Sequence, residues 1–150
     1  MRERIKAHFL EQAAFCTEYG SAFTGQLLEH FADDLDAGGP IARLVANWPT
    51  NPRADVVGLR LAGALHAAAL TGRDAALAHA YPAANPSWSM DQVWPVARAF
   101  VERESEWVRD FLQFAPQTNE TRRSIALLAP FLAFAQLWRG PIDMLEIGAS

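Results

Sequence analysis

The spacing of the apolar residues constrains the fold most, because they recur every three or four positions between glycine and proline breaks. In the first segment Ile5, Phe9 and Cys16 share one helical face, and Gly20 ends the pattern. Ser21 then offers a cap for the next helix. The same reasoning predicts about six to seven helices, over residues 2–19, 21–37, 41–46, 55–70, 73–80, 89 or 91 to 115, and 118 or 119 to 138. The predicted fold class is therefore all-α, a multi-helix bundle.

The segment 55–70 is expected to be the central helix of this bundle. It carries Gly58, Gly63 and several alanines, so much of its surface lacks bulky side chains. Glycine inside a helix costs up to about 1 kcal/mol relative to alanine, and close packing offsets that cost. The following loop, 81–88, is rich in turn-forming residues, and Trp48 in the preceding loop is expected to fold back onto the core.

The closing residues have a different pattern, that of a short buried strand. Residues 142–147 are mostly apolar and lead into Gly148, and no upstream segment is a comparable strand candidate. A strand that ends in an acidic residue and a glycine turn is typical of the start of a nucleotide-binding α/β fold. The alternative is an ordinary C-terminal strand or helix end. We expect a helical domain over 1–140 and the beginning of a Rossmann-like domain over 141–150.

The segment from Ile125 to Trp138 is apolar on every side except at Gln136, and Pro130 is expected to bend or interrupt it. It is shorter than the roughly 20 residues that cross a bilayer, so no membrane span is expected. A helix of this kind needs cover from protein all round. The sequence therefore predicts a homo-oligomer that forms through this helix and the tail after it; the alternative is a tail that folds into the groove beside this helix.

Charge and cysteine content limit the class of partner. Thirteen Lys and Arg against seventeen Asp and Glu give a net charge of −4 over 150 residues, which provides no field to attract nucleic acid. Cys16 is the single cysteine, and the charged N-terminal residues do not resemble a secretory signal. A cytoplasmic protein without nucleic-acid or membrane partners is expected.

The histidines give no strong indication of a metal site. His8 lies three residues before Glu11, and His30 three before Asp33, but neither pair has a matching second pair. His66 is expected to be a histidine satisfied inside the bundle rather than a ligand or base. No metal site is predicted, Cys16 is expected to be a buried thiol, and the acidic residues Asp33, Asp34 and Asp36 are expected at the surface.

Several motifs lie along nearly the whole chain: Ala37-Gly38-Gly39-Pro40, Pro52-Arg53-Ala54-Asp55, residues 59–66, Tyr81-Pro82, Gln117-Thr118-Asn119-Glu120, Arg123-Ser124 and residues 145–150. In this order they resemble a family of uncharacterised bacterial proteins, domain of unknown function 2332. The family looks like an N-terminal helical domain followed by a Rossmann-like domain similar to S-adenosylmethionine-dependent methyltransferases. The resemblance implies that this chain ends just inside that second domain.

Two functions follow from the resemblance and the pattern. The first is an accessory helical domain of a methyltransferase-like protein, inactive and without cofactor by itself. In a complete protein the polar cluster around residue 117 would line the S-adenosylmethionine site, although helix capping is the alternative role for that cluster. The expected cofactor-binding residues are Gln117, Thr118, Asn119, Glu120, Arg123, Glu146 and Gly148. The second function is a self-standing helical interaction or dimerisation module. An enzyme confined to the bundle ranks third, because no acid–base pair is evident.

Overall fold

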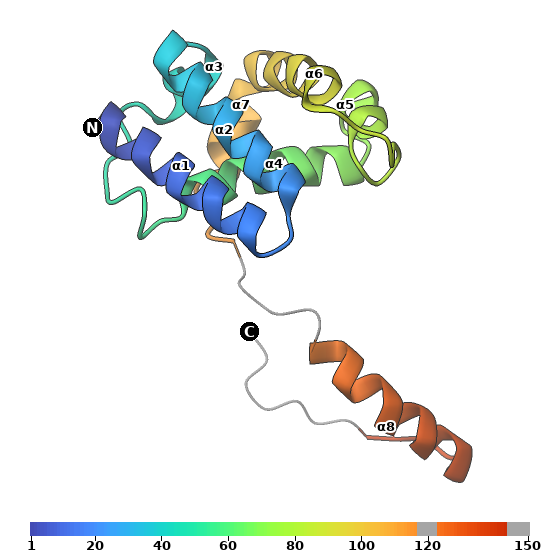
Figure 1. Ribbon diagram of the computed structural model, residues 1–150. Helices are drawn as coiled ribbons and strands as arrows, with labels where there is room; N and C mark the ends of the chain where they lie inside the picture. The colour runs from blue at the N-terminus through green and yellow to red at the C-terminus, as the bar shows by residue number, and fades with distance from the viewer. Residues whose placement is uncertain (117–122, 144–150) are drawn as a thin grey trace. The chain divides into compact units, whose positions relative to one another are not determined.

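The computed structural model describes residues 1–116 and 123–143. They belong to two units, Met1–Pro116 and Gln117–Ser150, and the described residues contain helices and no strand (Figure 1). The all-α prediction is therefore confirmed. The helices are α1 (Arg2–Glu18), α2 (Ala22–Ala37), α3 (Pro40–Val45), α4 (Val57–Leu70), α5 (Ala75–Ala80), α6 (Met90–Arg103), α7 (Ser105–Phe111) and α8 (Arg123–Leu137).

The first two helices form the antiparallel pair that the sequence predicts (Figure 1). They approach closely at Gly25, where an added Cβ atom would lie 2.1 Å from Oγ1 of Thr17. At the end of α2, Gly38 has a φ angle of 71°, a left-handed conformation that closes a helix at little cost for glycine. The predicted helix end at this glycine is therefore confirmed.

Helix α4 lies at the centre of the first unit, as its small residues predict. It contacts α1, α2, α5 and α7. A Cβ atom on Gly58 would lie 2.7 Å from Cδ2 of Leu28 and 3.2 Å from Cδ1 of Phe9, so the glycine is required by packing. The helix starts at Val57, two residues later than predicted, because Val56 takes a left-handed conformation with φ 48°.

The prediction of one long helix before Pro116 is wrong in one respect, because the structure has two helices there, α6 and α7, with a break at Glu104. The φ and ψ angles of Glu104 are −106° and 29°, outside the helical region. Its carboxylate accepts hydrogen bonds from Arg73, whose guanidinium lies 4.7 Å from the ring centre of Trp107. The break contains no glycine or proline and coincides with an ion pair to a residue distant in sequence, so periodicity alone does not reveal it.

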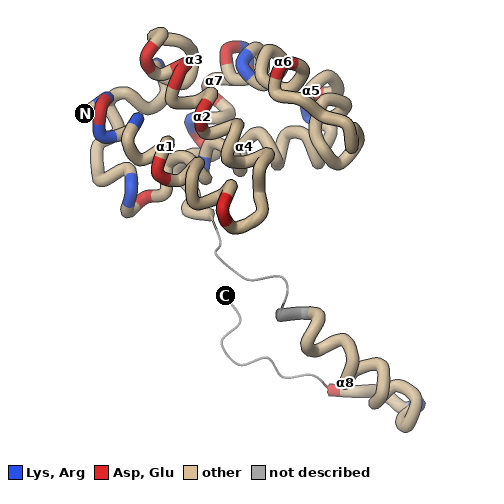
Figure 2. The backbone as a smooth tube through the Cα atoms, viewed as in Figure 1, with Lys and Arg blue, Asp and Glu red and all other residues tan. Residues whose placement is uncertain are grey.

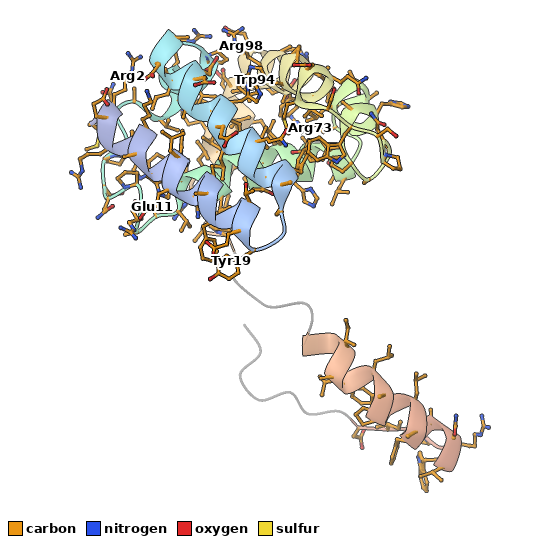
Figure 3. All side chains as sticks on the ribbon, in the orientation of Figure 1. Arg2, Glu11, Tyr19, Arg73, Trp94 and Arg98 are labelled. Carbon is orange, nitrogen blue, oxygen red and sulfur yellow. The ribbon has the colours of Figure 1, made fainter. Side chains whose placement is uncertain are left out.

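The prediction of three surface acids at the end of α2 is also wrong for Asp34. Its side chain is only 3% exposed and accepts a hydrogen bond of 2.8 Å from Nε of Arg98. The second carboxylate oxygen accepts from the backbone N–H of Ile41 at 2.8 Å. Burial of this charge is possible because both oxygens have a donor. Asp34 thereby ties α2 to α3 and α6 (Figure 3).

The second unit contains α8, with Pro130 inside it, followed by residues without regular structure as far as Asp143. Its described helix is free of charged side chains along almost its whole length (Figure 2). Large apolar side chains of α8 are between 44% and 85% exposed; they are Ile125, Leu127, Leu128, Phe131, Leu132, Phe134 and Leu137. As the sequence predicts, this helix therefore has apolar surface that requires contact with other protein.

The predicted closing strand lies mostly outside the described residues, because only its first two positions, Ile142 and Asp143, are described, and neither belongs to a strand. The candidate helix caps Thr118 and Asn119 also lie outside. The predicted domain boundary after residue 140 stays a prediction. Within the described residues, no helix combines the length and the apolar character that a bilayer crossing requires.

Candidate functional site

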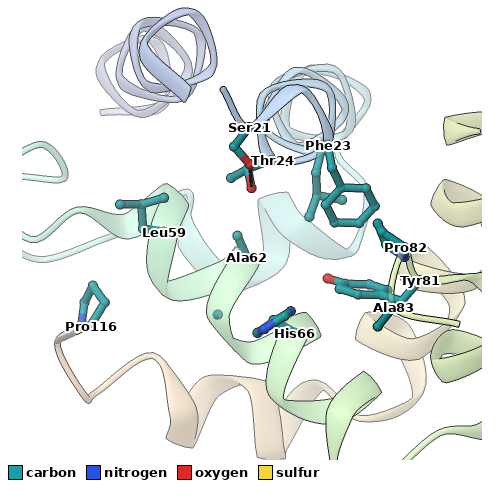
Figure 4. Close-up of a pocket in the computed structure, with 12 residues that line it drawn as sticks. Ser21, Phe23, Thr24, Leu59, Ala62, His66, Tyr81, Pro82, Ala83 and Pro116 are labelled. Atoms are coloured by element: carbon teal, nitrogen blue, oxygen red, sulfur yellow. Dashed lines mark hydrogen bonds between the residues drawn. The ribbon is translucent and has the colours of Figure 1, made fainter. Parts of the chain in front are cut away.

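The first unit contains an apolar cavity of about 510 Å³ that is open to solvent (Figure 4). This volume lies within the range of about 300–1,000 Å³ that is usual for small-molecule sites. The walls come from α2, α4 and the loop after α5. We call this cavity the α2–α4 pocket; its lining residues are Ser21, Phe23, Thr24, Leu27, Leu59, Ala62, Gly63, His66, Tyr81, Pro82, Ala83 and Pro116.

Helix α4 supplies one wall because four of its residues fall on one face. Leu59, Ala62, Gly63 and His66 are separated by three, four and seven positions, which is the spacing of neighbours on a helix surface. Two of the four are small, so the wall is hollow at its middle (Figure 4). The second wall begins with α2, and Tyr81 closes the third side directly after α5.

The two glycines of α4 have different reasons to be small. Gly58 is held against Leu28 and Phe9 so tightly that no side chain fits. A Cβ atom on Gly63 would have Cε1 of Phe111 as its nearest neighbour, at an ordinary contact distance of 3.7 Å. Packing therefore accounts for Gly58 and leaves room for a methyl group at Gly63, which lines the pocket.

Tyr81 is the most unusual polar residue of the pocket. The residue is 3% exposed, and its hydroxyl oxygen is covered and has no hydrogen-bond partner among the described residues. Burial raises the pKa of the phenol, so the side chain is neutral and keeps its proton to donate. Leaving such a buried group unsatisfied costs about 1–3 kcal/mol. Native proteins retain few such groups, and each one calls for an explanation.

The aromatic neighbours of Tyr81 fix the position of its ring. Phe23 packs against it edge to face, with ring centres 4.9 Å apart, and against Trp88 in the same way at 5.0 Å. The hydroxyl end of Tyr81 points toward the space between Phe23 and His66, on the pocket side of its ring (Figure 4). The fold therefore directs an unpaired donor to this edge of the pocket.

His66 corrects the sequence-based interpretation, because it is exposed and not satisfied inside the bundle. Its ring centre lies 5.9 Å from that of Tyr81. It occupies the same face of α4 as Gly63, at the open edge of the pocket (Figure 4). The residue that was expected to fill the interior instead forms part of the rim.

The pocket is electrically neutral at its walls. Its lining contains no Asp, Glu, Lys or Arg. Two hydroxyl groups of the α2 wall are already paired, since Oγ of Ser21 donates to Oγ1 of Thr24 at 2.7 Å. The polar side chains of the lining are therefore the phenol of Tyr81, the imidazole of His66 and this hydroxyl pair, in which Thr24 keeps its own proton.

His8, another histidine that the sequence analysis considers, is buried between helices rather than placed in the α2–α4 pocket. It is 5% exposed, and its Nε2 accepts a long hydrogen bond of 3.4 Å from the backbone N–H of Gly58 at the start of α4. Burial lowers its pKa, which keeps the imidazole neutral.

Among the described residues, no group of three or more His, Cys, Asp and Glu side chains is arranged to hold a metal ion. Cys16 is partly buried against the core, and burial raises the pKa of its thiol.

Of the cofactor-binding residues predicted from the sequence, only one belongs to the described part of the chain. Arg123 is the first residue of α8. The others lie outside the described residues: Gln117, Thr118, Asn119, Glu120, Glu146 and Gly148. The sequence did mark the loop after Tyr81 as rich in turn formers, but it gave no signal that the phenol is unpaired, because that depends on how Phe23 packs.

The fold and the pocket place the first unit among all-α domains with an open apolar cavity. The chain belongs to the family DUF2332, described as an uncharacterised protein conserved in bacteria, whose model matches residues 6–150. The predicted family is thereby confirmed. No curated protein and no solved structure matches the chain.

Proposed function

We propose that Met1–Pro116 is an accessory recognition domain of a methyltransferase-like protein, which binds a small molecule in the α2–α4 pocket and catalyses no reaction itself. The observation that carries this proposal is the unpaired, buried hydroxyl of Tyr81 at the edge of a 510 Å³ apolar cavity. An apolar pocket with a few polar groups is the usual form of a small-molecule site. The cost of the unpaired hydroxyl in the free protein is offset when a ligand accepts a hydrogen bond from it.

The polar groups of the pocket favour recognition over catalysis. General acid–base chemistry needs a titratable side chain with a pKa near the working pH, positioned on the reacting group. The raised pKa of Tyr81 moves this group away from that range. His66 lies at the exposed rim, with no carboxylate in the pocket lining to orient its ring. A donor that stays protonated serves to position a ligand.

The link to methyl transfer rests on the motifs quoted above that resemble methyltransferase-like members of the family. We propose S-adenosylmethionine as a cofactor of a complete protein only, held through the residues predicted from the sequence. These are Gln117, Thr118, Asn119, Glu120, Arg123, Glu146 and Gly148. The 150 residues alone are expected to show no saturable binding in a calorimetric titration with S-adenosylmethionine. Saturable binding would overturn this part of the proposal.

Recognition by the pocket is tested with the uncharged probe N-phenyl-1-naphthylamine, by following amide signals in ¹H–¹⁵N NMR spectra. We expect saturable shifts at Gly63 and Tyr81. Ala62→Leu fills the hollow of the α4 wall and abolishes these shifts. Ala99→Leu adds the same side chain at an exposed position of α6 and preserves them. Shifts that are absent in the parent chain, or unchanged in Ala62→Leu, contradict the proposal.

A second candidate function is self-association through α8, and a specific observation favours it. Large apolar side chains along the helix remain exposed, from 44% for Phe131 to 85% for Leu137. Burial of each such side chain stabilises an assembly by about 1.5–3 kcal/mol. We propose that a second copy of this chain supplies that cover, which makes the protein a homo-oligomer.

Sedimentation velocity tests this second candidate. The parent chain is expected to sediment as a dimer or larger assembly, and the double variant Leu128→Glu/Leu132→Glu as a monomer, because charge on α8 opposes its burial. Ala99→Glu on the exposed face of α6 is the control and keeps the parent state. If parent and double variant are both monomers, association through α8 is excluded.

A further inference from the structure

We infer that the α2–α4 pocket selects an uncharged, flat ligand that carries a hydrogen-bond acceptor, such as a carbonyl or ether oxygen, for the Tyr81 hydroxyl. This inference deepens the proposed recognition function and rests on it. Three features of the lining carry it: the unpaired donor, the neutral walls and the aromatic edge.

The donor defines the polar part of the ligand. The Tyr81 hydroxyl is a buried donor whose proton has no acceptor among the described residues. A ligand oxygen that lacks a proton of its own matches this group, because it accepts without adding a second unpaired donor. A site built around a buried polar group discriminates against ligands that cannot pair with it, since the group then stays unsatisfied. The acceptor is therefore a requirement for tight binding.

The walls define the charge of the ligand. With no Asp, Glu, Lys or Arg in the lining, a carboxylate or ammonium group would lose its water without gaining a counter-charge. His66 is the single histidine of the lining, and it lies at the exposed rim. A group that remains in solvent there gains little from a charge interaction. Neutral ligands are therefore favoured.

The aromatic edge defines the shape of the ligand. Phe23 is fixed between Tyr81 and Trp88 by two edge-to-face contacts, and the ring of His66 faces the same space from α4 (Figure 4). Aromatic walls favour flat ligands through offset-stacked and edge-to-face contacts. The small side chain of Ala62 leaves the opposite wall open to receive such a ring. An aryl ketone or a similar molecule combines these properties.

Three probes of similar size separate these requirements: acetophenone, ethylbenzene and benzoate. Each is titrated against the full chain and followed by NMR at the amides of Gly63 and Tyr81. We expect acetophenone to bind roughly fivefold more tightly than ethylbenzene, which is the contribution of one neutral hydrogen bond. Benzoate is expected to cause no saturable shift.

Tyr81→Phe removes the hydroxyl and retains the ring, so it is the matched variant. It is expected to reduce acetophenone binding to the level of ethylbenzene and to leave ethylbenzene binding unchanged. Thermal unfolding of the free variant is not expected to occur at a lower temperature, because the lost hydroxyl has no partner among the described residues. A lower unfolding temperature would show that the hydroxyl has a structural role and would overturn the inference.

The outcomes distinguish the inference from the function on which it rests. Equal affinities for acetophenone and ethylbenzene, an acetophenone advantage that persists in Tyr81→Phe, or tight binding of benzoate overturns the inference and leaves recognition of apolar molecules intact. Failure of all three probes, together with N-phenyl-1-naphthylamine, to shift the Gly63 amide overturns both.

Discussion

The helices of the first unit and helix α8 are both rich in apolar residues, but they use them differently. In the first unit each of these helices has an apolar face that is buried against its neighbours: Phe9 of α1, Phe31 of α2 and Phe100 of α6 are at most 1% exposed. In α8 apolar residues lie all round the helix, and its large apolar side chains are between 44% and 85% exposed.

The difference teaches that the arrangement of apolar residues around a helix, rather than their number, decides which neighbours can cover the helix. An amphipathic helix can satisfy its apolar stripe with a few neighbours from its own domain and expose the other face to water. A helix without a polar face needs cover on every side. The first unit also contains a buried polar tie, from Asp34 to Arg98 and Ile41, that fixes which helices meet. Along α8 from Ser124 to Leu137 there is no charged residue to do the same.

The largest expected effect is the difference between two leucine-to-alanine variants, one in the first unit and one in α8. Leu28→Ala removes a side chain that is 0% exposed beside Gly58, and it is expected to lower the free energy of unfolding of the first unit by about 2–5 kcal/mol. Leu132→Ala in α8 is expected to change that free energy by less than about 0.5 kcal/mol. Denaturant unfolding, monitored through hydrogen exchange of α1 and α2 amides, gives the change in the free energy of unfolding for both variants. Equal losses of stability in the two variants would contradict the difference between the first unit and α8.

The next effect tests the buried polar tie. Asp34→Asn keeps the size of the side chain but removes the charge that Arg98 pairs with, and a loss of about 1.5–3 kcal/mol is expected. Asp33→Asn one residue earlier changes an exposed acid and is expected to have an effect within about 0.5 kcal/mol. Chemical denaturation of both variants compares them. If the two variants are equally stable, Asp34 does not tie the helices together.

The smallest effect concerns His8, the buried histidine against the start of α4. Because burial lowers its pKa, the unfolded chain binds a proton more readily than the folded one. Stability is therefore full above the ordinary pKa of 6.5 and falls as the pH drops through the lowered pKa of the folded state. Glu11 opposes this shift and Arg53 supports it. His8→Gln is expected to flatten this part of the pH profile of unfolding, whereas the exposed His79→Gln leaves it in place. An unchanged slope in His8→Gln would exclude His8 as its source.

The sequence predicts those features that depend on neighbours along the chain. The helix positions follow from apolar spacing, the end of α2 follows from Gly38, and the central place of α4 follows from its small residues. Features that depend on partners distant in sequence are not predicted. The break at Glu104 involves Arg73, and the burial of Asp34 requires Arg98, 64 residues away.

The candidate site illustrates the same limit. Local turn chemistry predicts the loop that contains Tyr81, but the lack of a partner for its hydroxyl depends on the packing of Phe23 from another helix. The exposure of His66 likewise depends on which side of α4 remains open. The predicted cofactor-binding residues rest on the polar cluster, the glycine turn and the family resemblance. Arg123 is described, whereas Gln117, Thr118, Asn119, Glu120, Glu146 and Gly148 lie outside the described residues. They stay predictions.

Amide hydrogen exchange of the intact chain at two protein concentrations tests the central comparison most directly. The account predicts that amides of α1, α2 and α4 are protected to the same extent at both concentrations, because each buries its apolar face within one unit. Amides of α8 should become more protected as the concentration rises, because we propose that a second copy covers this helix. Protection of α8 that is strong and independent of concentration would contradict the account.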